Sequence, residues 1–366
     1  MNPREQSWLR LHLTPGLGRA GIIRLIEAFG SPEEALDVGP VAWKKRASIR
    51  STVAEALPGH NSPLFLETLE NLERLNVHIV SLWDDEDYPA LLRSIYDPPA
   101  LLYVRGGLPR HPGLAVVGAR QASLPNQRLT HTLCQQIAAQ GFAIVSGLAR
   151  GIDRAAHEGA LAANGTTVAV LGCGIDRIYP LDNAHLFDQI PAQGGAIVSE
   201  YPPDTAPLAR HFPGRNRIIS GMCQGVLVVE AAVRSGSLIT AGFALDQGRE
   251  VFAIPGPAYS PASCGTNQLL KDGAHLVTES ADILDILRPG SADNRPSIEE
   301  DPFENQLSGQ TLRVYHELQD SPLHVDELAR KCGLTPMEVS AILLHLELAN
   351  GAIQLPGMRF VRKRSS

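Results

Sequence analysis

Apolar residues in the first 70 positions recur at helical spacing. In IIRLIEAF (22–29) and FLETLENLERL (65–75) they lie three or four residues apart, and Pro and Gly residues interrupt the pattern. A small helical domain is therefore predicted over residues 1–72. Its PGLG segment (15–18) lies between two helical patterns and is typical of a helix-hairpin-helix or SAM-like domain.

The pattern changes at about residue 77. Short aliphatic and β-branched runs, apolar without alternation, follow one another with Ala/Leu-rich helical stretches between them. Strands of that kind are buried on both faces, as in a parallel sheet covered by helices. Residues 77–288 are therefore predicted to form a Rossmann-like, doubly wound α/β domain. The runs are LAVVGAR (114–120), FAIVSGLA (142–149), TVAVLG (167–172), GAIVSE (195–200), GVLVVEA (225–231), EVFAIPG (250–256) and AHLVTES (274–280).

Beyond residue 288 the composition changes again. Residues 289–308 combine Pro, Gly and Ser with a surplus of acidic side chains, which predicts a solvated linker. The segments TLRVYHEL, HVDELARKCG and LTPMEVSAILLHLELANG then predict three helices, and AIQLPGMRFVRK predicts a hairpin. Residues 309–362 are thus expected to form a winged-helix domain.

Composition narrows the class of protein. The 366 residues are 44% hydrophobic but only 5% aromatic, which indicates a globular protein with an aliphatic core. Five widely spaced cysteines without a CxxC pattern favour neither a disulfide framework nor a zinc site, so a reducing, cytoplasmic location is expected. No apolar run approaches the roughly 20 residues that span a bilayer, and no membrane insertion, metal or cofactor is expected.

The charge distribution is more informative than the net charge of −7. Acidic residues concentrate in the linker and the C-terminal helices, which leaves room for a local basic groove on an acidic molecule. The central domain carries the cations of that groove. They are Arg120, Arg150, Arg154, Arg177, Arg210, Arg215, Arg217 and Arg234.

The run from Phe212 to Thr240 predicts one wall of a phosphate-binding site. It opens with Arg215-Asn216-Arg217, continues through buried-strand residues and ends in Ser235-Gly236-Ser237, so that guanidinium groups and backbone N–H donors converge on an anion. Three strand ends supply further glycine-bearing loops, and loops at the carboxyl ends of parallel strands meet at one edge of the sheet. They contain Gly118, Ala119 and Arg120; Ser146, Gly147, Arg150 and Gly151; and Gly172 and Gly174.

Other interpretations of these residues remain open. The glycines also suit tight turns between strand and helix, and Asp153 suits helix capping as well as catalysis. His157 suits packing within a helix. Glu200 and Glu230 end strands and can pair with the phosphate-binding arginines. The GxGxxG match at residues 16–21 follows no strand, so it does not indicate a dinucleotide site.

The motifs together resemble one known family. VVGAR, SGLARGIDRAAHEGAL, VLGCGIDRIYP, GGAIVSEYPP, HFPGRNRIISG, VVEAAVRSGSLITA and GREVFAIPG, in this order, are similar to the DNA-processing protein A family, DprA or Smf. The resemblance is close over residues 100–290 and implies an extended Rossmann fold. It further implies a non-catalytic homodimer that binds and protects incoming single-stranded DNA and loads a RecA recombinase in natural transformation.

Carried onto this chain, the resemblance implies DNA contacts by Arg120, by Ser146, Gly147 and Gly151, and by Phe212, Arg215 and Arg217. Single strands are bound by cations along the phosphates and by an aromatic face under a base, and Phe212 suits the second role. A hydrophobic staple before a helix is the other reading of Phe212. Relatives often carry lysines just before the FPxRN motif, whereas here Arg210 is the nearest cation.

The flanking domains have weaker signals for DNA. The PGLG turn and the basic residues from Lys44 to Arg50 fit a second phosphate contact and a solvated helix face equally well. In the winged helix, the segment from Thr335 has no Lys or Arg before Asn350, so contact with protein or simple stabilisation is favoured over duplex recognition.

The alternative to a DNA-binding protein is a nucleotide-binding enzyme. The fold also resembles nucleoside-monophosphate phosphoribohydrolases, which carry a PGGxGTxxE loop and a catalytic glutamate. Here the corresponding segment reads VVEAAVRSGSLITA (228–241), which lacks that order of residues. The binding protein is therefore preferred over the enzyme.

Overall fold

A computed structural model describes residues 1–84, 86–111, 113–288, 307–318, 323–349, 351–355 and 357–362. The chain forms two compact units, Met1–Pro289 and Gly290–Ser366. The predicted linker lies, for residues 289–306, outside the described residues.

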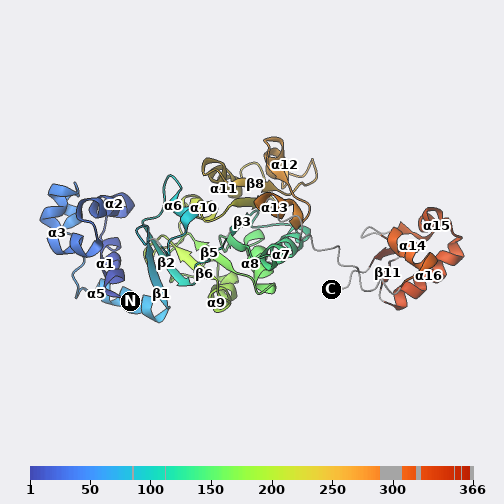
Figure 1. Cartoon of the computed structure of the whole chain (residues 1–366), viewed down its shortest axis with the longest axis horizontal. Helices are drawn as coiled ribbons and strands as arrows, with labels where there is room; N and C mark the ends of the chain where they lie inside the picture. Colours follow the sequence, from blue (N-terminus) through green and yellow to red (C-terminus); the bar gives the residue numbers. More distant parts are fainter. Residues whose placement is uncertain are drawn as a thin grey trace. The chain divides into compact units, whose positions relative to one another are not determined.

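The first 76 residues are helical (Figure 1). Several of the helices begin at side chains that bond their own first turn: Asn2 with Glu5, Ser31 with the Glu34 amide, and Ser62 with that of Phe65. A proline in the first turn after each of these residues pre-sets the helical φ. The helices are α1 (Pro3–His12), α2 (Gly18–Phe29), α3 (Pro32–Arg46), α4 (Ser51–Ala54) and α5 (Pro63–Arg74).

One sheet runs through the rest of the first unit. Its strand order is β1-β2-β6-β5-β4-β3-β7-β8-β9, and all pairs from β6 to β9 are parallel. The predicted mostly parallel sheet is confirmed, with each of the seven predicted runs supplying one strand. The strands are β1 (Val77–Ser81), β2 (Leu101–Gly106), β3 (Gly113–Val117), β4 (Ala143–Ser146), β5 (Thr167–Leu171), β6 (Ala196–Ser199), β7 (Gly225–Val228), β8 (Glu250–Ala253) and β9 (His275–Leu276).

One edge of the sheet differs from the expectation. The strands β1 and β2 were not among the predicted runs, and they pair antiparallel with each other and, through β2, with β6. The Tyr103 hydroxyl, in β2, shares a hydrogen bond of 2.9 Å with Nδ1 of His12 in α1. This antiparallel edge is where the N-terminal helices join the sheet.

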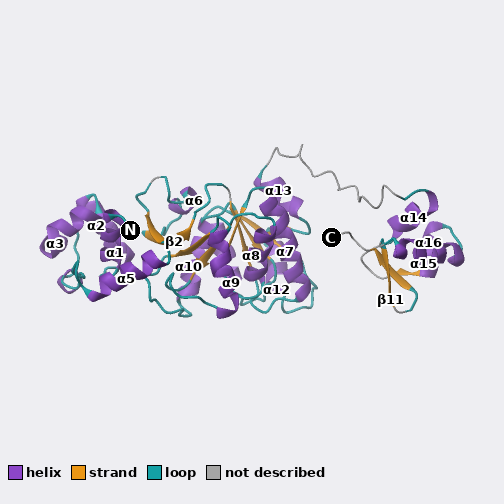
Figure 2. Cartoon of the chain, turned by 90° about the horizontal axis from the view of Figure 1, so that it is seen from below, coloured by secondary structure: helices purple, strands orange, loops and turns teal. Residues whose placement is uncertain are grey.

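Helices cover both faces of the sheet (Figure 2). Successive residues of β3 point to opposite cores: Leu114 and Val116 pack with the helices of one face, Ala115 and Val117 with those of the other. The first face carries α7 (Leu124–Ala139), α8 (Ile152–Ala162), α9 (Ala184–Ala192) and α13 (Ser280–Leu287). The second carries α6 (Ala90–Arg93), α10 (His211–Gly221), α11 (Gly236–Asp246) and α12 (Cys264–Lys271).

The chain reverses its direction across the sheet between β3 and β7. From β3 it moves outward through β4, β5 and β6, and it then returns to place β7 on the other side of β3. In open α/β sheets ligands bind in the crevice beyond the carboxyl ends of the strands at such a switch point.

The second unit has its own core, formed by residues such as Tyr315, Leu328 and Phe360. Three helices precede a hairpin, and a short strand before α15 completes a three-stranded antiparallel sheet in the order β10-β12-β11. The predicted winged helix is thereby confirmed. Its elements are α14 (Gly309–Glu317), β10 (Leu323–His324), α15 (Val325–Cys332), α16 (Pro336–Leu348), β11 (Ala352–Leu355) and β12 (Arg359–Arg362).

Within the described ranges, none of the helices combines the length and the hydropathy needed to cross a membrane.

Candidate nucleic-acid interface

A cavity of about 450 Å³ opens at the switch point between β3 and β7. Its floor is the end of β3 at Val117 and Gly118, one wall is α10, and the opposite wall is the N-terminal turn of α11. Helices α10 and α11 pack against each other (Figure 1), which fixes the two walls. We call it the switch-point cavity.

Half of the predicted site residues line the switch-point cavity. They come from three segments far apart in the sequence, and the fold brings them together as the strand-end argument required. They are Gly118, Arg120, Phe212, Arg215, Asn216, Ser235, Gly236 and Ser237. The other eight do not line it: Ser146, Gly147, Arg150, Gly151, Gly172, Gly174, Arg210 and Arg217.

Arg215 is buried under the cavity, with 4% of its surface exposed. Its Nη1 donates to the Gly147 carbonyl at 2.9 Å and to the Val170 carbonyl. Burial lowers the pKa of Arg215 to about 10, and the nearby Asp153 carboxylate opposes that effect. Within the described part of the chain its Nε has no hydrogen-bond partner. Arg215 therefore holds two strand ends together and adds positive charge to the cavity from below.

Arg217, two residues later, faces another direction. Its guanidinium group donates to both oxygens of Glu200 at 2.6 and 2.8 Å and to Asp97 at 3.1 Å. Asp97 also pairs with Arg19, at the start of α2. Burial alone lowers the pKa of Arg217, but Glu200 and Asp97 raise it above the ordinary value. This four-residue network ties the N-terminal helices to α10 and leaves no donor of Arg217 directed at the cavity.

The exposed cation of the cavity is Arg120. Its guanidinium carbon lies 5.4 Å from the centre of the Phe212 ring, and that of Arg215 lies 5.8 Å from the same centre. The ring of Tyr179, 42% exposed, stands 5.9 Å from Phe212. The entrance thus offers two aromatic rings and a cation side by side, which is the combination that base stacking and phosphate pairing require.

Two of the predicted glycines make room for the side chains of the site. A Cβ on Gly147 would lie 2.5 Å from Arg215 Nη1, and one on Gly172 would lie 2.8 Å from the Phe212 ring. Gly151 has φ +75°, and a Cβ there would collide with the Ala119 carbonyl. Gly151 therefore fits the tight-turn interpretation, and Gly147 and Gly172 are needed for close packing, which the sequence analysis did not consider.

Two amides of the loop after β4 bond a carboxylate of the next helix. The Asp153 carboxylate accepts from the Gly147 amide at 3.1 Å and from the Ala149 amide at 3.3 Å. Burial raises the pKa of Asp153, and Arg215 is the first influence that lowers it. Ser146 Oγ donates to the Val116 carbonyl. Asp153 therefore fixes the shape of the loop through the amides of Gly147 and Ala149.

The remaining acid/base candidates are structural. His157 is fully buried, shares a 2.7 Å hydrogen bond with Thr167, and burial lowers its pKa to about 3. Glu230 accepts from the Ser123 amide and hydroxyl and from Asn126, not from an arginine. The possible pairing of a strand-end glutamate with an arginine is present for Glu200, whereas among the described residues Glu230 pairs with no arginine.

At the α11 wall the Ser-Gly-Ser segment caps its own helix. Ser235 is the N-cap residue, accepts weakly from the Ser237 amide at 3.4 Å and shares a 2.7 Å hydrogen bond with the Ser237 hydroxyl. Asn216 of α10 donates to the Gly236 carbonyl at 3.3 Å. The Leu238 amide also bonds the Ser235 carbonyl, so this wall offers the cavity the Gly236 amide, the serine hydroxyls and the positive end of the α11 dipole.

Tyr179 and Thr240 are the aromatic and hydroxyl-bearing lining residues that the sequence analysis missed. Tyr179 belongs to the quoted motif VLGCGIDRIYP, but nothing in the order of residues predicts that its ring reaches Phe212. Thr240 lies one turn after Ser237, and that spacing on a helix was the available signal.

Two predicted cations are exposed outside the cavity. Arg150 pairs with Asp182 at 2.6 Å, and Arg210 immediately precedes α10.

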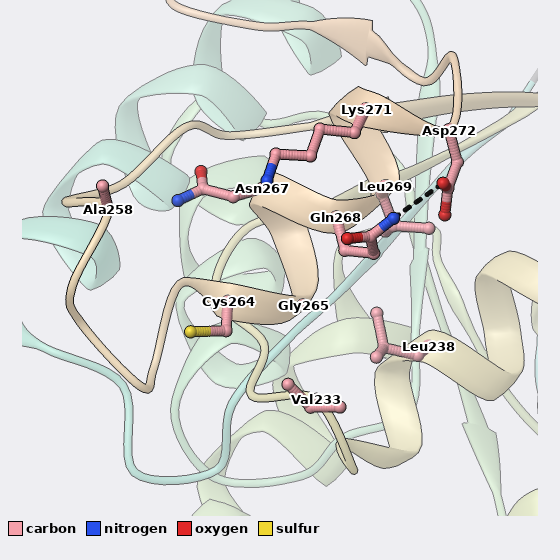
Figure 3. A pocket seen from close by; sticks show the side chains of 10 residues that line it. All are labelled: Val233, Leu238, Ala258, Cys264, Gly265, Asn267, Gln268, Leu269, Lys271 and Asp272. Carbon is pink, nitrogen blue, oxygen red and sulfur yellow. Dashed lines mark hydrogen bonds between the residues drawn. The ribbon is translucent and has the colours of Figure 1, made fainter.

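The structure contains a larger cavity, of about 630 Å³, between α11 and α12 (Figure 3). We call it the α12 cavity. Val233, Leu238 and Leu269 give it an apolar lining, and Lys271 is the one cation among its lining residues. Gln268 donates to Asp272 at 2.8 Å at the end of α12 (Figure 3). It lacks the converging donors of the switch-point cavity.

Comparison with known proteins gives consistent results over both units. The family model of DNA recombination-mediator protein A matches residues 79–288, and that of the DprA winged helix domain matches residues 299–358. Protein Smf of Escherichia coli is 46% identical over 299 residues, which cover 80% of this chain and 79% of that protein. Protein Smf of Synechocystis is 33% identical over 400 residues, with 99% and 100% covered.

Solved structures give the same result. DNA processing protein A of Streptococcus pneumoniae is 36% identical with a TM-score of 0.67, covering 78% of this chain and 98% of its own. DNA processing protein A of Helicobacter pylori, described for its single-stranded DNA binding mode, is 30% identical with a TM-score of 0.52, covering 58% and 96%.

Proposed function

The chain belongs to the DNA recombination-mediator protein A family, also called DprA or Smf, and on that premise we propose that it binds single-stranded DNA in the switch-point cavity. Its role lies in DNA processing. The observation that carries the proposal is the convergence of Arg120, Phe212 and the Ser235–Ser237 turn on one opening.

The proposed binding mode divides the work among these residues. Arg120 pairs with a phosphate at the rim, and Phe212 and Tyr179 supply faces on which a base stacks. Asn216 and the serine turn contribute hydrogen bonds, while Arg215 adds charge from below. Backbone and stacking contacts of this kind are indifferent to base sequence. Gly118 lines the floor, and a Cβ there would collide with the Ile152 side chain.

The predicted site residues that do not line the cavity have supporting roles in the proposed binding mode. Arg150 and Arg210 are exposed and extend the basic path of a longer strand. Ser146, Gly147, Gly151, Gly172 and Gly174 shape the loops behind the cavity, and Arg217 holds α10 in position.

We further propose that the protein acts without catalysis, in the cytoplasm, as a homodimer that passes the bound strand to a RecA-type recombinase. The engagement of these three groups by their neighbours supports a non-catalytic site: Asp153 accepts from two loop amides, His157 bonds Thr167, and Glu200 bonds Arg217.

The test is binding of a labelled single strand of about 20 nucleotides and of the matching duplex, titrated with salt. We expect the single strand to bind more tightly. Arg120→Ala should weaken binding for every sequence and reduce the slope of log K against log salt by about one. The matched control is Arg110→Ala, which removes another exposed arginine, paired with Asp87 before β3.

Equal affinity for both nucleic acids, or equal losses in the two variants, would reject the proposed interface. Release of free base from nucleoside monophosphates incubated with the protein would instead favour the phosphoribohydrolase alternative.

A further inference from the structure

The α11 wall of the switch-point cavity contains a hydroxyl group without a partner. Thr240 is fully buried and lines the cavity, and in the described part of the chain no group accepts from or donates to its Oγ1. A buried hydroxyl without a hydrogen-bond partner destabilises the folded state. Such a cost indicates that a ligand completes the hydrogen bond.

The neighbouring contacts explain why Thr240 is unpaired. A threonine inside a helix usually bonds the carbonyl four residues earlier, which here is that of Gly236. That carbonyl instead accepts from Asn216 of α10. Because Asn216 occupies this carbonyl, the Thr240 hydroxyl keeps its proton free to donate to a ligand in the cavity.

The unpaired hydroxyl lies one turn from the donors at the start of α11. Gly236 and Ser237 begin the helix, whose dipole is positive at this end. The Ser237 and Leu238 amides bond Ser235, so the Gly236 amide is the backbone donor left at this turn. On the opposite wall, Arg215 is also buried with an unpaired Nε. Several donors and a cation around one small space fit a group with many acceptor oxygens, which is a phosphate.

The cavity also limits the size of the ligand. At about 450 Å³ it lies in the range of small-molecule sites, roughly 300–1,000 Å³. The aromatic rings of Phe212 and Tyr179 stand at the same cavity and suit a base. The buried Asp153 carboxylate at the floor is offset by Arg215 and by two amides.

We propose that the switch-point cavity binds a nucleoside 5′-monophosphate, with its phosphate at Ser235–Ser237 and Thr240. A free nucleotide then occupies the place of one nucleotide of a bound strand and competes with it. The competition rests on the proposed function, whereas binding of the nucleotide itself does not.

The experiment measures binding of dAMP to the full chain by calorimetry and its competition with a labelled single strand. We expect dAMP to bind, deoxyadenosine to bind much more weakly, and Thr240→Val to weaken dAMP binding by roughly tenfold or more, as for one lost hydrogen bond to a charged group. Because valine removes an unpaired hydroxyl at the same volume, the midpoint of thermal unfolding should not fall.

The matched control is Thr130→Val, which changes another fully buried helical threonine whose hydroxyl donates to the Asn126 carbonyl, away from the cavity. It should leave dAMP affinity unchanged. Ser237→Ala is a second variant of the subsite and should weaken dAMP in the same direction.

The outcomes separate the two proposals. Strand binding without dAMP binding overturns the nucleotide subsite and leaves the proposed function intact. Binding of dAMP that is insensitive to Thr240→Val and Ser237→Ala also overturns the subsite. Binding of dAMP that depends on Thr240, in a protein that binds no strand, supports the subsite and rejects the proposed function.

Discussion

Of the two cavities of the first unit, the larger one has fewer polar and charged groups in its lining. The α12 cavity is the larger, about 630 Å³ against about 450 Å³, but its lining is mainly apolar and holds one lysine. The switch-point cavity collects Arg120, Arg215, two aromatic rings and the start of α11. Both open beside α11, but the strand order brings the polar loops at the strand ends to the switch-point cavity alone. Convergence of donors, rather than volume, distinguishes the candidate site.

Among the tests of the difference between the two cavities, substitution of Arg215 should have the largest effect. Arg215→Ala removes the hydrogen bonds to two strand ends and the positive charge that lowers the pKa of the buried Asp153 carboxylate. It also leaves two buried carbonyls without that donor, at a cost of about 1–3 kcal/mol of folding free energy for each. We expect a large fall in the urea midpoint of the first unit, measured by circular dichroism. An unchanged midpoint would show that Arg215 serves ligands alone.

An aromatic substitution should have an intermediate effect on binding. Phe212→Ala removes a stacking face and should weaken single-strand binding by about 1–3 kcal/mol. Tyr259→Ala, at a fully exposed tyrosine on the loop beside the α12 cavity, is the matched control and should have no effect. Fluorescence anisotropy at fixed salt measures both. Equal losses would mean that the strand crosses the two cavities alike.

The smallest effect is expected at the α12 cavity itself. Lys271→Ala removes its lysine, which is exposed, and should change strand affinity and folding stability by less than about 0.5 kcal/mol. The salt slope should also stay unchanged, in contrast to Arg120→Ala. A slope reduced by one in Lys271→Ala would remove the distinction between the cavities.

Local patterns predicted much of the fold because burial on both faces leaves a direct trace in the sequence. Continuous apolar runs such as LAVV and TVAVL became parallel strands. The pattern did not reveal β1 and β2, since their antiparallel pairing depends on partners across the sheet and on the helices that pack beside them.

The site was predictable only in part for a related reason. Strand-end loops and the Ser-Gly-Ser turn were recognisable from sequence because the topology of a parallel sheet gathers them. Arg215 and Arg217 look equivalent in the sequence, but Arg217 meets Asp97, 120 residues away, whereas Arg215 meets the carbonyls of Gly147 and Val170. Partners at such separations are set by tertiary packing, which no local pattern records.

The N-terminal helices share one apolar core with the sheet, and this has a consequence for the order of synthesis. Trp8, Leu9 and Leu72 belong to the same cluster as Tyr103, Leu171 and Ile197. A ribosome releases the helices well before it has made β6, and domains fold as their sequences emerge. During synthesis, part of the apolar surface of the first 76 residues therefore stays exposed to solvent until more than 120 further residues have been translated.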